Sequence, residues 1–201
     1  MEENRKKNIA KTIHEIKGIK FGEFTLTSGK TSPYYVDLRI IPSYPNLLKE
    51  IGEICALLIE DEIKGEHKIA GVPTSGLPFA TVVSQKLELP LLYVRKKKKS
   101  HGQKKNIEGE FEEGKIVLID DVSTTGGSLL DAVETIRDAG GSVRHAVVVL
   151  DREEGAEENL RQVGVDLHAC FSISDLIEYL KEYSIVDDKK YSMIMNYLEE
   201  R

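Results

Sequence analysis

Residues 116–128, IVLIDDVSTTGGS, place two adjacent carboxylates and a run of small polar residues directly after an apolar segment. Small residues let the backbone curl so that several N–H groups point at one centre, and Ser and Thr hydroxyls add further donors. A phosphate there would also meet the positive end of the helix that follows, which stabilises an anion by about 0.3–1 kcal/mol at an exposed site. The stretch from Val122 to Ser128 therefore predicts a phosphate-binding loop.

The two carboxylates, Asp120 and Asp121, need a different ligand group from the phosphate. Carboxylates only accept hydrogen bonds, so they suit the hydroxyls of a sugar, directly or through a metal ion. A sugar phosphate satisfies both features at once. The loop lacks the Gly-Lys-Ser/Thr of a Walker loop and the glycine spacing of a dinucleotide fingerprint. The alternative is purely structural, with Asp121 as a turn residue and Thr125 as a helix N-cap.

The elements that must hold this loop alternate along the chain. Strands that are solid apolar runs, separated by amphipathic helices, indicate a parallel sheet covered on both faces, and hence an α/β fold. Ligands of such sheets bind beyond the carboxyl ends of the strands, which is where the strand 116–120 delivers the carboxylates. Strands are expected at 68–72, 91–95, 116–120, 143–150 and 166–171, and helices at 45–62, 76–88, 126–139 and 155–163.

Both ends of the chain carry elements outside that alternation. Isoleucines at three- and four-residue steps predict a helix from about residue 4 to 18. Alternating Thr, Tyr and Val around a Ser-Gly-Lys turn predict a hairpin or two short strands within 21–39. Two more helices are expected at 174–183 and 188–199.

The segment 96–114, KKKKSHGQKKNIEGEFEEG, is polar, basic and long for a connection in an α/β protein. Connections of two to six residues are usual, and longer ones are often functional lids. From its charge alone, the segment could also be a solvated, disordered basic loop. Its composition also allows the interpretation that it is a nuclear-localisation signal.

The composition bounds the class of protein. A chain of 201 residues can form one domain with a substantial core. The formal net charge of −6 argues against a general nucleic-acid binder. No apolar run approaches the ~20 residues of a membrane span, and the polar start MEENRKK is not typical of a secretory signal. We therefore expect a cytoplasmic protein with no nucleic-acid or membrane partner.

Two cysteines and four histidines are expected to be structural. Cys55 and Cys170 lie in apolar runs without a partner at metal-ligand spacing, so they are expected to be buried thiols in a reducing compartment. The four histidines that lie in helix or strand patterns are His14, His67, His145 and His168.

The segment 116–128 resembles the signature of type I phosphoribosyltransferases, which bind 5-phosphoribosyl 1-diphosphate. Three more segments, in the same order, are similar to the orotate phosphoribosyltransferase family: FGEFTLTSGKTSPYYVD, YVRKKKKSHG and VVVLDREEGAEENL. The resemblance implies one phosphoribosyltransferase domain over 1–201, with a central parallel sheet flanked by helices and a small hood made by 1–43 and part of the C-terminal region. It implies transfer of the phosphoribosyl group to orotate, which gives orotidine 5′-monophosphate and diphosphate in pyrimidine biosynthesis.

The resemblance also implies which residues meet the phosphoribosyl donor. Asp120 and Asp121 would contact the ribose hydroxyls and act in catalysis, and the loop after them would hold the 5-phosphate. The segment 96–114 would be a mobile catalytic loop that meets the diphosphate, with Lys99 and His101 as its catalytic residues. The implied donor contacts are Arg95, Lys96, Lys99, His101, Asp120, Asp121, Val122, Ser123, Thr124, Thr125, Gly126, Gly127 and Ser128.

For orotate, the resemblance assigns the carboxylate to Arg152, whose planar guanidinium suits a carboxylate better than a lysine point charge. Without the neighbouring motifs, Arg152 also fits a surface ion pair with Glu153 or Glu154. The contacts implied for the pyrimidine ring are Thr124, Tyr35 and Val36, although Tyr34 and Tyr35 fit core aromatics equally well. Magnesium would be held mainly through the substrate, without a dedicated set of protein ligands. The implied assembly is a homodimer in which each catalytic loop closes over the neighbouring site.

Two positions depart from the family pattern. Thr27 and Ser75 stand where many members carry Lys. With Thr27, the cation near the hairpin is either missing or supplied by Lys30. The segment 73–78 is expected to offer backbone amides to the diphosphate instead.

Two rival functions remain open. A sister transferase for a purine would not need Arg152, and a non-catalytic regulator would need an added DNA-binding segment.

Overall fold

The computed structural model describes residues 2–25, 29, 31–65, 67–95, 106–110 and 114–199. The chain forms two compact units. The larger unit is Leu48–Cys170, and the smaller one joins Met1–Leu47 to Phe171–Arg201. Each unit is built around its own sheet.

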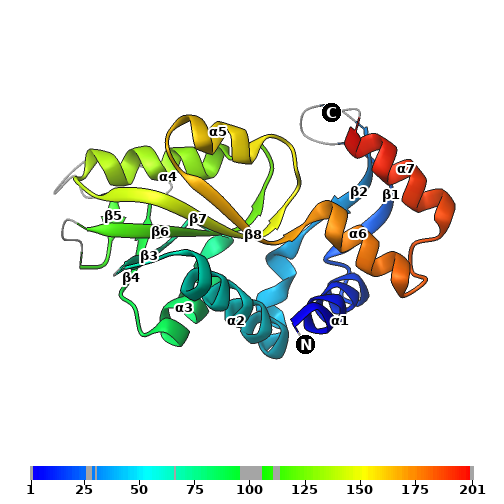
Figure 1. The fold of residues 1–201 in the computed structure, drawn as a ribbon, viewed down its shortest axis with the longest axis horizontal. Helices are drawn as coiled ribbons and strands as arrows, with labels where there is room; N and C mark the ends of the chain where they lie inside the picture. The colour runs from blue at the N-terminus through cyan, green and yellow to red at the C-terminus, as the bar shows by residue number, and fades with distance from the viewer. Residues whose placement is uncertain are drawn as a thin grey trace. The chain divides into compact units, whose positions relative to one another are not determined.

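The larger unit contains a six-stranded sheet with the strand order β5-β4-β3-β6-β7-β8 (Figure 1). β3 pairs in parallel with β4 and β6, and β6 pairs in parallel with β7, which confirms the predicted α/β class. β5 is antiparallel to β4 and was not predicted, because a two-residue strand leaves no periodic pattern. The strands are β3 Lys68–Gly71, β4 Leu91–Val94, β5 Ile107–Glu108, β6 Lys115–Ser123, β7 Ser142–Asp151 and β8 Asp166–Ser172.

Helices cover both faces of this sheet, as its solid apolar strands require. α2 and α3 lie on one face, and α4 and α5 lie on the other (Figure 1). The apolar residues of β6 from Ile116 to Ile119 are at most 1% exposed because they are covered on both sides. α4 turns one apolar stripe toward the sheet, namely Leu129, Ala132, Val133 and Ile136. The helices are α2 Pro45–Glu62, α3 Gly76–Leu87, α4 Gly127–Asp138 and α5 Ala156–Gln162.

Among the described residues, the smaller unit contains the predicted hairpin and three α-helices. β1 Ile19–Thr25 pairs antiparallel with β2 Thr31–Val36. α1 Glu2–Glu15 packs against α6 Ile173–Glu182, and α7 Asp188–Glu199 packs against both α6 and β2. A short 3₁₀ helix, Leu38–Ser43, follows β2. The segments predicted to form a hood fall in this unit, and the hood role itself stays a prediction.

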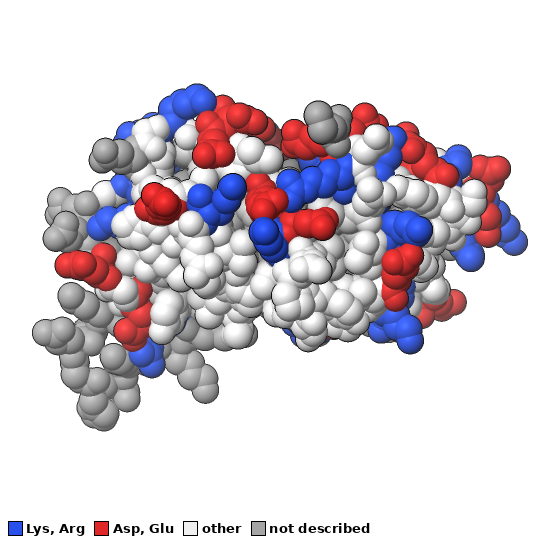
Figure 2. Space-filling model, turned by 90° about the horizontal axis from the view of Figure 1, so that it is seen from below, with Lys and Arg blue, Asp and Glu red and all other residues white. Residues whose placement is uncertain are grey.

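The charged side chains are mixed in sign on the face drawn in Figure 2. Lysine and arginine side chains lie beside aspartate and glutamate side chains there, with uncharged surface between them. Within the part of the chain that the structure covers, no helix combines the length and apolar character that crossing a bilayer requires.

Candidate active site

The strand before the predicted phosphate loop is longer than expected. β6 continues to Ser123, so Asp120 and Asp121 lie inside the strand and not at its end. The predicted boundary at residue 120 was wrong because pairing with β7 extends to the register Ser123↔Asp151. Asp120 is 6% exposed, and its Oδ1 accepts a hydrogen bond from the backbone N–H of Asp121 at 2.9 Å. The half-buried Asp121 is the next residue of the strand.

The predicted loop is shorter than expected, because β6 ends at Ser123 and α4 begins at Gly127. What remains is the turn between β6 and α4. Gly126 is the N-cap of α4 and has a φ of 81°, a left-handed conformation that glycine adopts without strain. The alternative that made Thr125 the N-cap was therefore wrong. The first N–H groups of a helix have no acceptor within that helix, so the amides after Gly126 can donate to a ligand at the turn. This arrangement suits an anion.

α5 braces the outer side of the turn. The side-chain amide of Asn159 donates to the carbonyl oxygen of Thr125 at 2.9 Å. A Cβ atom on Gly126 would lie 3.4 Å from Cα of Ala156, so the two backbones approach closely. The turn is thus held between β6, α4 and α5.

The end of β7 is joined to this turn by side-chain and backbone hydrogen bonds. The hydroxyl of Ser123 donates to Oδ1 of Asp151 at 2.7 Å, and the N–H of Arg152 donates to the carbonyl of Ser123 at 3.0 Å. Arg152 therefore lies beside the turn between β6 and α4, although the two are far apart in sequence. Only the parallel pairing of β6 with β7 creates this proximity.

The guanidinium of Arg152 is buried and oriented. Arg152 is 7% exposed, and its Nη2 lies 2.8 Å from Oε1 of Glu154. The alternative prediction of an ion pair with Glu154 is thus confirmed, but the pair is not on the surface. A buried, pre-oriented guanidinium is a strong recognition group for a planar carboxylate.

A third segment reaches the same edge of the sheet from the end of β3. A cis peptide bond joins Pro73 to Thr74, and α3 begins at Gly76. The N–H of Gly76 donates to the carbonyl of Val72 at 3.1 Å, and that of Leu77 donates to Thr74 at 3.4 Å. These two amides of the segment 73–78 are therefore already used by the chain itself.

Gly76 packs directly against the strand that carries the carboxylates. A Cβ atom there would lie 2.4 Å from the carbonyl oxygen of Ile119 and 3.0 Å from Oδ1 of Asp120. We expect Gly76→Ala to lower the free energy of unfolding by about 1–3 kcal/mol, because the methyl group overpacks this contact. If Asp120 contacts the phosphoribosyl donor as predicted, Gly76→Ala should also lower kcat/KM for that donor at least about tenfold, since Asp120 must move.

Thermal unfolding and initial-rate kinetics on the same preparation check this prediction. Gly127→Ala is the control for stability, because a Cβ at Gly127 meets no atom within 4 Å. It should unfold at the wild-type temperature or slightly above it. A Gly76→Ala protein with wild-type stability and turnover would contradict the packing argument.

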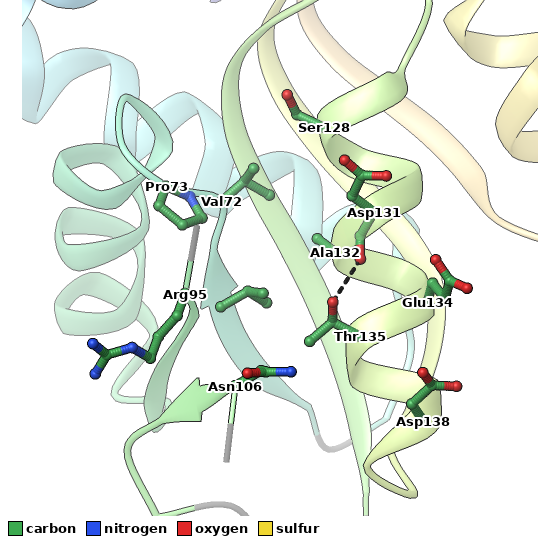
Figure 3. Close-up of a pocket in the computed structure, with 11 residues that line it drawn as sticks. Val72, Pro73, Arg95, Asn106, Ser128, Asp131, Ala132, Glu134, Thr135 and Asp138 are labelled. Atoms are coloured by element: carbon green, nitrogen blue, oxygen red, sulfur yellow. Dashed lines mark hydrogen bonds between the residues drawn. The ribbon is translucent and has the colours of Figure 1, made fainter. Parts of the chain in front are cut away.

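A cavity of about 310 Å³ lies between α4 and the ends of β3 and β4 (Figure 3). Val72 and Pro73 form one wall, and α4 contributes Ser128 at the upper end. Farther along α4, the wall carries three carboxylates, from Asp131, Glu134 and Asp138. Carboxylates repel phosphate, so this cavity suits an anion less well than the turn before α4 does.

Arg95, a predicted donor contact, also borders that cavity. Its guanidinium points away from α4 in Figure 3 and donates to Glu108 on β5. Its side chain is 39% exposed, so the ion pair lies in contact with solvent. The other predicted cations of this segment, Lys96, Lys99 and His101, lie outside the described residues.

The predicted pyrimidine contacts Tyr35 and Val36 lie on β2 of the smaller unit and are both half-buried. The ring of Tyr35 lies 5.6 Å from that of Phe24, and its hydroxyl accepts from Arg39 at 3.4 Å. Tyr34 points to the opposite side of the strand and is 0% exposed. Of the two tyrosines, Tyr34 is therefore the core aromatic. Thr27 and Lys30 lie outside the described residues.

Three of the four histidines expected to be structural form a cluster of their own. His145 Nδ1 lies 3.2 Å from His168 Nε2, and His168 Nδ1 lies 2.6 Å from Oε2 of Glu62. The ring of His67 lies edge-on to that of His145. Burial, followed by the charge of His168, lowers the pKa of His145 below its usual value. His145 pairs with Val117 near the start of β6, at the opposite end of the sheet from Asp151.

Sequence reasoning missed the residues that hold the site together. Asp151, Asn159 and Gly76 touch the turn or its carboxylates only through the tertiary fold. The one available signal was position, because Asp151 directly precedes Arg152 at the end of a predicted strand.

The fold and this turn are typical of one class of protein, and comparison with known sequences gives its name. Residues 39–167 match the family model described as the phosphoribosyl transferase domain. An orotate phosphoribosyltransferase of Methanocaldococcus jannaschii is 46% identical over 174 residues, which are 86% of this chain and 97% of that protein. One from Sulfolobus acidocaldarius is 39% identical and covers 95% of this chain and 96% of its own. The chain belongs to the orotate phosphoribosyltransferase family.

Solved structures are also similar over most of this chain. The orotate phosphoribosyltransferase of Aeropyrum pernix superposes with a TM-score of 0.75 at 31% identity, covering 86% of this chain and 99% of that one. The Mycobacterium tuberculosis H37Rv enzyme, in complex with 5-phospho-α-D-ribosyl 1-diphosphate, gives 0.69 at 28%, covering 86% and 98%. The UMP synthase of Leishmania donovani gives 0.86 at 32% and covers 97% of this chain, which spans only 42% of that longer protein.

Proposed function

We propose that this protein transfers the phosphoribosyl group of 5-phosphoribosyl 1-diphosphate to orotate, giving orotidine 5′-monophosphate and diphosphate in pyrimidine biosynthesis. The observation that carries the proposal is one backbone hydrogen bond, from Arg152 to Ser123 at 3.0 Å. This bond places a buried guanidinium beside the phosphate turn at the same edge of the sheet. The similar relatives are named orotate phosphoribosyltransferases, which supports the same reaction.

The donor is bound by both ends of its sugar. Asp120 and Asp121 accept hydrogen bonds from the ribose hydroxyls, and the turn from Val122 to Ser128 holds the 5-phosphate on backbone amides and hydroxyls. The two groups lie in successive residues of one strand and turn, which suits a ligand that carries hydroxyls and a phosphate on one sugar. Fixing the sugar in this way positions C1 for attack.

The acceptor is oriented by its carboxylate. Arg152 binds the carboxylate of orotate through its guanidinium fork, and Glu154 holds that fork in place. Thr124 contacts the pyrimidine ring from the turn, and the ring contacts expected from Tyr35 and Val36 stay predictions. A purine carries no carboxylate at the matching position, which makes Arg152 the residue that selects the base.

Bond breaking at C1 runs ahead of attack by the ring nitrogen, so the site must neutralise the departing diphosphate and exclude water. Arg95, Lys96, Lys99 and His101 supply cations to that diphosphate, with His101 as the acid. Among the described residues no group of three or more His, Cys, Asp or Glu side chains is arranged to hold a metal ion. The carboxylates of Asp120 and Asp121 fit Mg²⁺, which binds through one or two carboxylates together with substrate oxygens. When bound, Mg²⁺ adds charge neutralisation on the diphosphate.

The assembly proposed with this reaction is a cytoplasmic homodimer in which the segment 96–114 of one chain completes the site of the other. The family precedent supports it. Light scattering of the purified protein checks the mass, and mixing Lys99→Ala with Asp120→Asn chains checks the sharing. Mixed dimers should regain activity that neither variant has alone.

One assay tests the reaction. The loss of orotate absorbance is followed after addition of 5-phosphoribosyl 1-diphosphate and magnesium, with adenine, hypoxanthine, xanthine and uracil as competing bases. Orotate should be consumed and diphosphate released in equal amounts, and none of the other bases should react at a comparable rate. Turnover of a purine without turnover of orotate would overturn the proposed acceptor.

A further inference from the structure

The two cysteines lie against each other in the interior of the larger unit. Cys55 on α2 and Cys170 on β8 are 0% and 2% exposed, and their Sγ atoms are 3.0 Å apart. Both are free thiols in this structure. A disulfide joins sulfur atoms at about 2.0 Å, so a shift of roughly 1 Å separates this contact from a covalent bond.

The two elements that carry the cysteines are held in register by a second contact. His168 on β8 lies 2.6 Å from Glu62 on α2. Cys55 and Glu62 are seven residues apart and so lie on one face of α2, while His168 and Cys170 are two residues apart and lie on one face of β8. The two contacts thus join the same two faces, which keeps the sulfur atoms facing each other.

The thiols are protected once the chain has folded. The hydrogen bond with Cys170, followed by burial, raises the pKa of Cys55 well above the usual value of a thiol. A buried, protonated thiol reacts slowly, because the thiolate is the nucleophile in disulfide exchange. An oxidant therefore reaches this pair while the chain folds or during a transient opening of α2 from β8.

We propose that Cys55 and Cys170 form an intramolecular disulfide that fastens α2 to β8 when the chain folds in the presence of a small-molecule disulfide. The thiolate of one cysteine attacks a sulfur of the reagent and expels one thiolate, which leaves a mixed disulfide. The second cysteine thiolate attacks the bound cysteine sulfur and expels the other reagent thiolate. Both cysteines lose a proton, and the reagent is reduced to two thiols.

The bond would close a loop between residues 115 positions apart. Loops of this length give stabilisation toward the upper end of the usual range, so the oxidised protein should unfold about 5–15 °C above the reduced one. Neither cysteine is among the residues placed at the active site, so kcat should be the same in both forms at 25 °C.

The test starts from the full chain unfolded in denaturant with reductant. It is refolded with oxidised glutathione or with reductant, unfolded again and treated with iodoacetamide before mass spectrometry. The chain refolded with oxidised glutathione should carry no alkyl group. Its mass should be two hydrogens less than that of the reduced chain before alkylation. A peptide digest should contain the cross-linked pair. Two alkylated cysteines, or cysteines that carry glutathione, would overturn the proposal.

The thermal measurement uses variants as internal controls. Cys55→Ala and Cys170→Ala should each unfold at one temperature whatever the redox condition, while the wild type should show the shift. Because each variant is compared with itself, a loss of core packing does not affect the result. A wild-type midpoint independent of reductant, in a sample whose mass shows the cross-link, would contradict the stabilising role.

Discussion

Replacing Asp120 and Asp121 together by asparagine should lower kcat/KM for 5-phosphoribosyl 1-diphosphate by about a thousandfold. Each carboxylate is proposed to accept a charge-assisted hydrogen bond from a ribose hydroxyl, worth about 1.5–3 kcal/mol, and the amide replaces it with a weaker neutral bond. The fold should survive, because asparagine can still accept the bond that Asp120 Oδ1 receives from the N–H of residue 121. Initial-rate kinetics with varied donor concentration measures the effect.

Asp131→Asn provides the matched control for this double variant. It makes the same chemical change on an exposed position of α4, in the acidic wall of the neighbouring cavity. Its kcat/KM should stay within about twofold of wild type, as expected for a surface substitution. A double variant that keeps more than a tenth of wild-type efficiency would remove the carboxylates from the donor site.

Arg152→Ala should raise KM for orotate by about a hundredfold and leave KM for the donor nearly unchanged. The variant loses the guanidinium fork and leaves the half-buried Glu154 without its arginine, where it repels the orotate carboxylate. Removing one partner of this partly buried pair also destabilises the fold, so the kinetics must be measured below the midpoint of thermal unfolding.

Two further variants separate recognition from stability. Arg152→Lys keeps the charge but loses the planar fork, so its KM for orotate should stay at least about tenfold above wild type. Arg161→Ala removes an arginine that pairs with glutamates on α5 and is 60% exposed, and it should change neither constant. A rise confined to the donor KM in Arg152→Ala would show that Arg152 does not anchor the base.

The larger unit was predictable because its strands and helices obey simple periodicities. The helix 45–62 has the predicted bounds, and the other predicted elements of this unit differ by a few residues at their ends. The main difference is β6, which runs on to Ser123 because its pairing with β7 continues past the apolar run. A hydrophobic pattern ends where side chains become polar, whereas a strand ends where its backbone pairing stops.

The residues of the candidate site could be named from the sequence, but the way in which the fold arranges them could not. The phosphate turn is local, so its small residues and following helix are visible in 116–128. The contacts between Ser123 and Asp151, and between Gly76 and Asp120, join segments that are distant in sequence. No periodicity encodes them. The contact between Cys55 and Cys170 is of the same kind, since the sequence indicates that both are buried but not that they meet.

Isothermal titration of the wild-type protein with 5-phosphoribosyl 1-diphosphate and magnesium tests the central claim most directly. If Asp120, Asp121 and the turn after them hold the pentose phosphate, the titration should show one site per chain. The same titration of the Asp120→Asn/Asp121→Asn protein should show binding weakened by about a hundredfold or more. Absence of heat with the wild type, or equal affinity in the two proteins, would contradict the account.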